Sequence, residues 1–325
     1  MRRPTLRSVL SACCLSILLA AHLWVVPAEA QVSVTMQKSG SEATLLGMFF
    51  RDAQLGWAVG SGGTILKTTD GGKKWKKVAS GTTALLTAVY FQDARHGWVV
   101  GANGTVRMSQ DGGETWTPKI VSSQAPLYGI AFATPTKGWL VGGNGTILQT
   151  ADGGATWTDQ ASGTNAALHA IAVTSEQQGT IVGALGTILT TSDGGRTWST
   201  QQTQSSATFF DIAFADEANG WAVGNAGALF QTTDGGLHWI DRTLPCGRTC
   251  HKLTDLIRVR FTDAQQGWIV GERGQILRTS DAGYNWTEEA SPVKRSLMAL
   301  SFPQAASGWA AGEGGTIISI TQARR

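Results

Sequence analysis

The sequence predicts an all-β protein built from one repeated unit, and three observations lead to that prediction. A pattern of two glycines around an apolar run, GWAVG in the first unit and GTIVG in the fourth, recurs at steps of 41 residues, with a single step of 47; six of its seven copies begin with a Gly-Trp pair. Each unit holds four short apolar or alternating runs bounded by turn residues, and no run has helical periodicity. The pattern begins at Gly56, Gly97, Gly138, Gly179, Gly220, Gly267 and Gly308. Seven such units, each of four antiparallel strands, predict a seven-bladed β-propeller.

The second unit shows the order of elements within a blade. Its runs are LLTAVYF, GWVVGA, TVRMSQ and TWTPKIV, separated by QDARH, NG and DGGE. β-Branched and apolar residues favour strands, whereas Gly, Asn and Asp favour tight turns. The first strand of each unit is expected to line the central channel, and the fourth to lie at the outer edge.

The seventh unit ends after TIISITQ and lacks a fourth run. The other end of the chain supplies it, because Gly40 precedes Gly81, and Phe50 precedes Phe91, by the same 41 residues. This phase aligns VSVTMQKS with the fourth run of a blade. We therefore expect residues 32–39 to form the outermost strand of the last blade and to close the ring, which removes an open sheet edge.

Residues 1–30 have the three parts of a secretory signal peptide. MRRPTLR is basic, the stretch after it is apolar, and Ala28-Glu29-Ala30 offers a small-residue cleavage site before Gln31. We expect residues 1–30 to be removed and residues 31–325 to form one propeller domain without a transmembrane segment. The protein is then exported to the periplasm or secreted. Lipidation at Cys13 and an uncleaved anchor are the alternatives.

The charge balance argues against a nucleic-acid partner. Removing the three arginines and one glutamate of residues 1–30 from the 26 basic and 23 acidic residues leaves a net charge of +1. A polyanion requires a strongly basic face, which this balance does not provide. No metal site is indicated, because His96, His169, His238 and His251 lack the spacing of metal ligands. No cofactor is expected, and the chain is expected to be a monomer.

Six units carry an Asp-box between their third and fourth runs, as in TTDGGKKW. An aspartate that accepts backbone N–H bonds, glycines with positive φ and a tryptophan over the turn indicate a tightly closed hairpin. The aspartates are Asp70, Asp111, Asp152, Asp193, Asp234 and Asp281. Separate blades would spread these carboxylates around a rim, so we interpret them as structural. Every tryptophan after residue 30 belongs to this motif or to a Gly-Trp pair, so the aromatic content does not indicate a sugar-stacking platform.

The consensus GWxVGxxGTILxTxDGGxxW runs over nearly all of residues 32–320 and resembles the photosystem II stability and assembly factor family of seven-bladed propellers. The resemblance implies an assembly or binding factor without a cofactor. Its partner would be another protein, such as a membrane-protein assembly intermediate, and its location would be the thylakoid lumen if the host is photosynthetic. The family's basic docking patch cannot be transferred residue by residue, because its arginines lie outside the repeat motif.

Asp-boxes also occur in sialidases and other glycosidases, so a glycan-binding or glycoside-hydrolase propeller is the alternative function. A sialidase-like site needs an arginine triad, a tyrosine nucleophile and an acid-base carboxylate. The only tyrosines are Tyr90, Tyr128 and Tyr284, and Tyr284 lies inside an Asp-box. Glu272 and Glu313, at matching positions of adjacent units, are candidate glycosidase carboxylates, although solvated loop charge is the simpler interpretation. We therefore favour a non-enzymatic protein.

The repeat is broken between the fifth and sixth units, where the longer step inserts additional residues. First strands mostly carry small or apolar residues, but Asp211 and Arg258 share the third position in consecutive units, and Arg260 holds the fifth. Asp211 and Arg258 are expected to form an ion pair between two blades, unless Arg258 serves binding instead. Arg260 has no partner in register and is expected to reach the channel.

The insertion and its neighbours suggest a surface for an anionic partner. The insertion is expected on the same face as the loops between second and third strands, and a Cys246–Cys250 disulfide would fix its shape in an oxidising compartment. An ordinary solvated loop is the alternative. The candidate partner-binding residues are Arg242, Arg248, Lys252, Arg258, Arg260 and Arg273.

Overall fold

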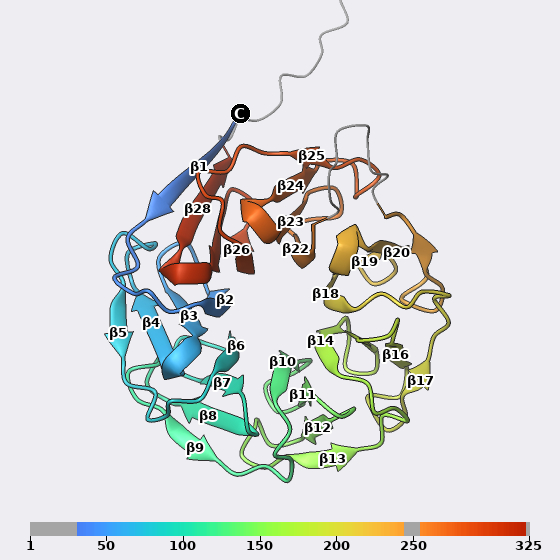
Figure 1. Ribbon diagram of the computed structural model, residues 1–325. Helices are drawn as coiled ribbons and strands as arrows, with labels where there is room; N and C mark the ends of the chain where they lie inside the picture. Colours follow the sequence, from blue (N-terminus) through green and yellow to red (C-terminus); the bar gives the residue numbers. More distant parts are fainter. Residues whose placement is uncertain (1–30, 244–253, 323–325) are drawn as a thin grey trace, which may run out of the picture.

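Seven four-stranded antiparallel sheets surround a central axis in the computed structural model, which describes residues 31–243 and 254–322 (Figure 1). Each sheet is one blade, and six of the blades run outward from the axis in chain order. Among the described residues, no helix is long and apolar enough to span a membrane. The fold is therefore the seven-bladed β-propeller that the repeat predicts.

The strands of the blades have the following bounds. Blade 1 contains β2 (Leu45–Phe50), β3 (Gly56–Gly60), β4 (Thr64–Thr68) and β5 (Lys76–Val78). Blade 2 contains β6 (Leu86–Phe91), β7 (Gly97–Gly101), β8 (Thr105–Ser109) and β9 (Thr117–Lys119). Blade 3 contains β10 (Leu127–Phe132), β11 (Gly138–Gly142), β12 (Ile147–Thr150) and β13 (Thr158–Gln160). Blade 4 contains β14 (Leu168–Val173), β15 (Gly179–Gly183), β16 (Ile188–Thr191) and β17 (Ser199–Thr200).

The remaining blades follow the same order. Blade 5 contains β18 (Phe209–Phe214), β19 (Gly220–Gly224), β20 (Leu229–Thr232) and β21 (Ile240–Asp241). Blade 6 contains β22 (Leu256–Phe261), β23 (Gly267–Gly271), β24 (Ile276–Thr279) and β25 (Thr287–Glu288). Blade 7 contains β26 (Leu297–Gln304), β27 (Ser307–Gly312), β28 (Ile317–Gln322) and β1 (Val32–Gln37). Short 3-10 turns follow some second strands, namely η1 (Ser61–Gly63), η2 (Asn225–Gly227), η3 (Glu272–Gly274) and η4 (Glu313–Gly315).

The N-terminal strand closes the ring, as the phase of the repeat predicts. β1 pairs antiparallel with β28, from Val32 opposite Gln322 to Gln37 opposite Ile317 (Figure 1). Val32 and Val34 pack against the apolar cluster that blades 6 and 7 share. The strand ends two residues before the predicted boundary, because the Ser39 hydroxyl accepts the Ser41 N–H and donates to the Ser41 carbonyl in a turn.

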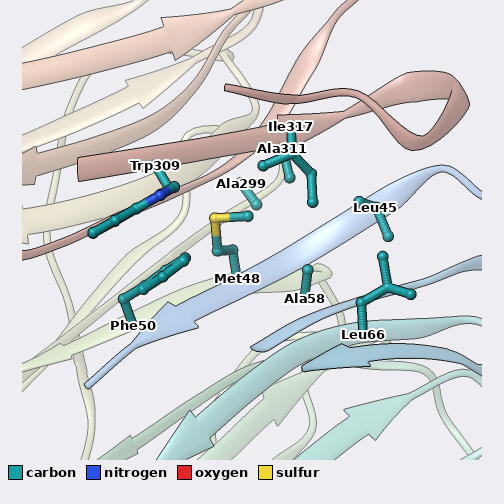
Figure 2. Close-up of a cluster of buried hydrophobic side chains, with 9 residues drawn as sticks. All are labelled: Leu45, Met48, Phe50, Ala58, Leu66, Ala299, Trp309, Ala311 and Ile317. Carbon is teal, nitrogen blue, oxygen red and sulfur yellow. The ribbon is translucent and has the colours of Figure 1, made fainter. Parts of the chain in front are cut away.

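Neighbouring blades are joined by an aromatic contact, which we call the blade lock. In it, the phenylalanine that ends a first strand lies against the Gly-Trp tryptophan of the preceding blade. The ring centroids of Phe91 and Trp57 are 3.5 Å apart, and those of Phe50 and Trp309, which join the last blade to the first, are 3.8 Å apart (Figure 2). Trp98 with Phe132 and Trp268 with Phe302 complete the set of four.

Further contacts tie each lock to the adjacent Asp-box turn. Trp57 Nε1 donates a hydrogen bond to the Gly112 carbonyl, and Trp309 Nε1 donates one to the Gly71 carbonyl. The Asp-box tryptophans pack edge-on against the same phenylalanines, as Trp75 does against Phe50. They therefore contact the first strand of their own blade, and the aromatic rings of two blades form one continuous stack.

Blade 4 lacks both partners of the lock. Thr180 stands where other blades have the Gly-Trp tryptophan, and Val173 stands where they have the terminal phenylalanine. Blade 4 consequently supplies neither the tryptophan of a lock with blade 5 nor the phenylalanine of a lock with blade 3. Blade 4 therefore forms no blade lock with either neighbour.

The lock also explains the glycine of the Gly-Trp pair. A Cβ atom on Gly138 would lie 2.6 Å from Phe132 Cδ1, because the phenyl ring covers the glycine of its own blade. At Gly179 the nearest atom to such a Cβ would be 3.5 Å away, because Val173 replaces the phenylalanine. Glycine is therefore required sterically in blade 3 but not in blade 4.

Replacing Gly138 by alanine is expected to destabilise the fold by about 2 kcal/mol, because the added methyl group displaces the Phe132 ring. Urea unfolding followed by tryptophan fluorescence measures the change. Gly179→Ala is the matched control and is expected to be neutral or slightly stabilising. Equal losses in the two variants would contradict the steric role of Phe132.

The Asp-box turns are held by hydrogen bonds to their aspartates. Asp152 Oδ1 accepts the Thr156 N–H at 2.9 Å, and Asp152 Oδ2 accepts the Thr156 hydroxyl at 2.6 Å. The Thr156 hydroxyl, and then its N–H, lower the pKa of Asp152 from 3.8 to about 2. The Thr115 hydroxyl and N–H act in the same way on Asp111, whose pKa is also about 2. These carboxylates are used within their own turns.

Acidification should therefore unfold the protein partly through these turns. A carboxylate whose folded pKa is lowered stabilises the fold above its unfolded pKa, and that stability is lost as the pH falls from about 4 to about 2. We expect the Asp111→Asn, Asp152→Asn double variant to be less stable near pH 6 and to lose less stability between pH 4 and 2.5. Urea unfolding across this range measures both quantities.

Asp159→Asn is the control, because the Asp159 carboxylate on β13 takes part in no turn of this kind. It is expected to keep the pH dependence of the wild type. An unchanged pH dependence in the double variant would show that the Asp-box hydrogen bonds do not contribute.

Candidate functional site

The two faces of the ring are built from different turns. On one face, loops between second and third strands bond to the connection that enters the first strand, as Ala102 N–H does to the Leu85 carbonyl. We call this the mouth face. On the other, the hairpin face, Asp-box turns bond to the turns between first and second strands, as Gly153 N–H does to the Thr136 carbonyl.

A cavity of about 360 Å³ opens at the end of the channel on the mouth face. In every blade the pairing of the first strand slips by one residue after its first position, as between Leu127 and Gly129. This bulge directs the second residue of each first strand toward the axis. The seven residues that line the cavity in this way are Leu46, Thr87, Tyr128, His169, Phe210, Ile257 and Met298. We call this cavity the channel mouth.

Sequence analysis missed these second positions, although a signal was present. The third and fifth positions of the first strands contain the unusual charges, but the second position holds a different side chain in every blade. The alternation of side chains along a strand would not by itself show that the second residue faces the axis, because a bulge changes which residues point there.

Asp211 forms its ion pair with Arg260 and not with Arg258, which corrects the prediction from equal positions. Arg260 Nη1 lies 2.5 Å from Asp211 Oδ2, and the same oxygen accepts the Val259 N–H at 3.0 Å. The Val259 N–H holds the Asp211 carboxylate one residue beyond Arg258 along β22. The carboxylate therefore lies within reach of Arg260. The ion pair is nonetheless a contact between blades 5 and 6.

Arg258 lies below the channel mouth without a bonded carboxylate among the described residues. Its Nη1 donates to its neighbour's carbonyl, Ile257 O, at 3.0 Å, and its Nη2 approaches the Leu46 carbonyl of blade 1 at 3.5 Å. Desolvation lowers the pKa of this guanidinium, Asp211 opposes that shift, and Arg260 adds to it. Arg258 keeps its charge, because a guanidinium does not lose its proton in proteins.

His169 gives the channel mouth a neutral acceptor. Its Nδ1 lies 2.9 Å from the Phe209 carbonyl, which fixes Nδ1 as the donor and leaves Nε2 as the acceptor of the neutral ring. Burial lowers the pKa of His169, and the nearby Arg258 lowers it further, although the Phe209 bond acts in the opposite direction. His169 is therefore neutral at pH 7.

Glu272 and Glu313 line the channel mouth and also brace its rim. Glu272 Oε2 accepts the Asp255 N–H at 3.3 Å, and Glu313 Oε2 accepts the Ser296 N–H at 3.1 Å. In the same way, Ser61 Oγ accepts the Thr44 N–H in blade 1, and Asn225 Oδ1 accepts the Thr208 N–H in blade 5. One oxygen of each glutamate is thus occupied by a backbone donor, while the other has no partner among the described residues.

The remaining patch residues do not gather at one place within the described part of the chain. Arg258 and Arg260 lie in the channel, whereas Arg242 follows the outer strand β21 and bonds to Gln231 at 3.2 Å. Arg273 stands at the tip of η3 on the mouth face. Arg248, Lys252, Cys246 and Cys250 lie outside the described residues, so their roles and the disulfide stay predictions.

Two loop tips on the mouth face carry bulky side chains on a left-handed backbone. Leu185 has φ of 56° and Arg273 has φ of 57°, at the position where Asn103 and Asn144 stand in blades 2 and 3. Asparagine and glycine adopt this conformation readily, whereas a bulky residue is strained there. The Leu185 side chain is 76% exposed, so no packing offsets its strain.

No group of three or more His, Cys, Asp and Glu residues within the described ranges could hold a metal ion. The fold and the channel mouth therefore define a propeller whose accessible cavity is lined by aromatic, apolar and charged side chains. Residues 73–127, 120–202 and 198–288 match the family described as Photosynthesis system II assembly factor YCF48, and the chain belongs to that family.

Solved structures of low sequence identity share the fold. YCF48 from Cyanidioschyzon merolae is 20% identical, with a TM-score of 0.73 over 89% of this chain and 99% of that one. A structure titled YCF48 bound to D1 peptide has the same identity and TM-score, over 89% and 96% of the two chains. The GH74 xyloglucanase from Xanthomonas campestris is 12% identical, with a TM-score of 0.71 over 88% of this chain and 53% of that one. No curated protein sequence matches.

Removing the Asp211 carboxylate tests the charge balance of the channel. Asp211→Asn leaves two guanidiniums without their shared counter-ion and should destabilise the fold by about 2–3 kcal/mol, below the range for a fully buried pair, because the Arg260 side chain is 39% exposed. Urea unfolding measures the loss.

Adding Arg260→Met to Asp211→Asn removes one of the unpaired charges and should restore part of the stability. A single variant as stable as the wild type, or a double variant no better than the single, would contradict the role of the ion pair.

Proposed function

We propose that the chain is a non-enzymatic binding factor that holds a segment of another protein on its mouth face. The observation that carries the proposal is the distribution of departures from the repeat. The irregular second positions, the channel charges and the strained loop tips at Leu185 and Arg273 all belong to the mouth face or the channel beneath it. The Asp-box aspartates on the hairpin face, in contrast, are engaged in closing their own turns.

The strained tips support a binding role, because strain without internal compensation is typical of functional positions. Leu185 and Leu85, which are 76% and 40% exposed, present apolar surface on the mouth face. The relative titled YCF48 bound to D1 peptide supports a protein segment as the ligand. In this proposal the partner is a membrane-protein assembly intermediate.

The proposed location follows from residues 1–30. Their basic, apolar and small-residue parts support export to the periplasm or secretion. In a photosynthetic host the corresponding compartment is the thylakoid lumen.

The non-enzymatic part of the proposal rests on the chemistry of the channel mouth. Glu272 and Glu313 are the carboxylates of the glycosidase alternative, and they do line one cavity. However, each commits one oxygen to a backbone N–H of the rim. A general acid needs a carboxyl group that is free to exchange its proton with the substrate, so these bonds favour a structural role.

Replacing both strained residues, Leu185 and Arg273, by asparagine tests the docking surface. Leu185→Asn with Arg273→Asn should leave the fold unchanged or stabilise it by about 0.5–1 kcal/mol, because asparagine tolerates the left-handed backbone. The same variant should lose the protein partner that the wild type captures from membrane and periplasmic fractions. Urea unfolding and quantitative mass spectrometry of captured proteins measure the two effects.

Leu237→Asn is the matched control, since Leu237 is 55% exposed in an Asp-box turn on the hairpin face. It should keep the partner. Capture that survives in the double variant, or that is lost with Leu237→Asn, would contradict docking on the mouth face.

A further inference from the structure

We propose that the channel mouth binds a free amino acid with a large apolar side chain, or a molecule of the same charge pattern, in its zwitterionic form. This site goes beyond docking of a protein partner and does not depend on it. The evidence is the separation of charge along the cavity, with a cation at the floor, carboxylates at the rim and aromatic rings along the opposite wall.

Arg258, at the floor of the channel mouth, has N–H donors without acceptors among the described residues. A guanidinium has five N–H donors, and those of Arg258 have only the Ile257 and Leu46 carbonyls as acceptors among the described residues. The neighbouring Asp211 carboxylate is already bonded to Arg260 and to the Val259 N–H. A ligand carboxylate would supply both the missing charge and the missing acceptors.

The rim carries the opposite charge. Asp255, Glu272 and Glu313 line the same cavity as Arg258, and all three belong to blades 6 and 7. The second oxygen of Glu272 and of Glu313 has no partner among the described residues. A simple anion would be repelled by this rim, and a simple cation would be repelled by Arg258, whereas a ligand with both charges satisfies each end.

The wall across from these glutamates is apolar and aromatic. Tyr128, His169 and Phe210 form an arc over blades 3, 4 and 5, with neighbouring ring centroids 5.4 Å and 6.0 Å apart. Ile257 and Met298, on blades 6 and 7 beside the glutamates, add apolar surface to the cavity. A volume of about 360 Å³ lies at the small end of the range for ligand sites and suits one amino acid with a large apolar side chain.

Three ligands that share one ring test the charge pattern directly. L-Phenylalanine carries both charges, phenylacetate lacks the ammonium group, and phenethylamine lacks the carboxylate. Titration calorimetry at pH 7 should show that L-phenylalanine binds the wild-type protein at least about tenfold more tightly than either analogue. Equal affinities for the three ligands, or no binding of L-phenylalanine at millimolar concentration, would overturn the proposal.

Variants assign the two ends of the ligand. Arg258→Met should reduce the affinity for L-phenylalanine to that for phenethylamine, and Glu272→Gln should weaken L-phenylalanine binding while leaving phenylacetate binding unchanged or stronger. Glu114→Gln, in an Asp-box turn, is the control and should bind as the wild type does. Binding that is the same in Arg258→Met and in the wild type would place the ligand elsewhere and refute the site.

The partner-docking proposal is tested separately. Leu185 and Arg273 do not line the channel mouth, so their asparagine variants should keep L-phenylalanine binding even when the protein partner is lost. Either proposal can therefore fail while the other stands.

Discussion

The contact between a tryptophan of one blade and a phenylalanine of the next is the interaction on which the rest of the ring depends. It is consistent with the spacing of the repeat, because the Gly-Trp pair and the terminal phenylalanine meet across four blade boundaries. It also explains the glycine, since the phenyl ring occupies the space of a Cβ atom. Each aromatic pair contributes on the order of 1 kcal/mol beyond its buried area. Ring closure by β1 completes this arrangement, because blade 7 meets blade 1 through Trp309 and Phe50.

Because the repeated residues are used in packing, few positions remain for function. The second residue of each first strand is released from pairing by a bulge, and it varies from blade to blade. The channel charges, which the repeat does not require, lie on blades 5 and 6. The mouth face therefore combines variable side chains with a rigid scaffold, an arrangement typical of binding sites in repeat proteins.

The sequence was sufficient for the ring, the number of blades and the closing strand, because a fixed period of 41 residues constrains topology strongly. It also located the anomaly at Asp211, Arg258 and Arg260. It did not give the pairing among these three, because the Val259 N–H positions the carboxylate and no periodicity encodes that bond. The channel mouth was missed because bulges break strand alternation. The backbone strain at Leu185 could be inferred from the sequence only by comparison with Asn103 and Asn144, which hold the same position in blades 2 and 3.

Native-state hydrogen exchange tests the central role of the blade lock most directly. Blade 4 has Thr180 and Val173 in place of the two aromatic partners, so amides of β14 and β15 should lose protection before those of β2, β3, β6 and β7. Mass spectrometry of peptides from each blade measures the order. Exchange that is uniform around the ring, or slowest in blade 4, would contradict the account.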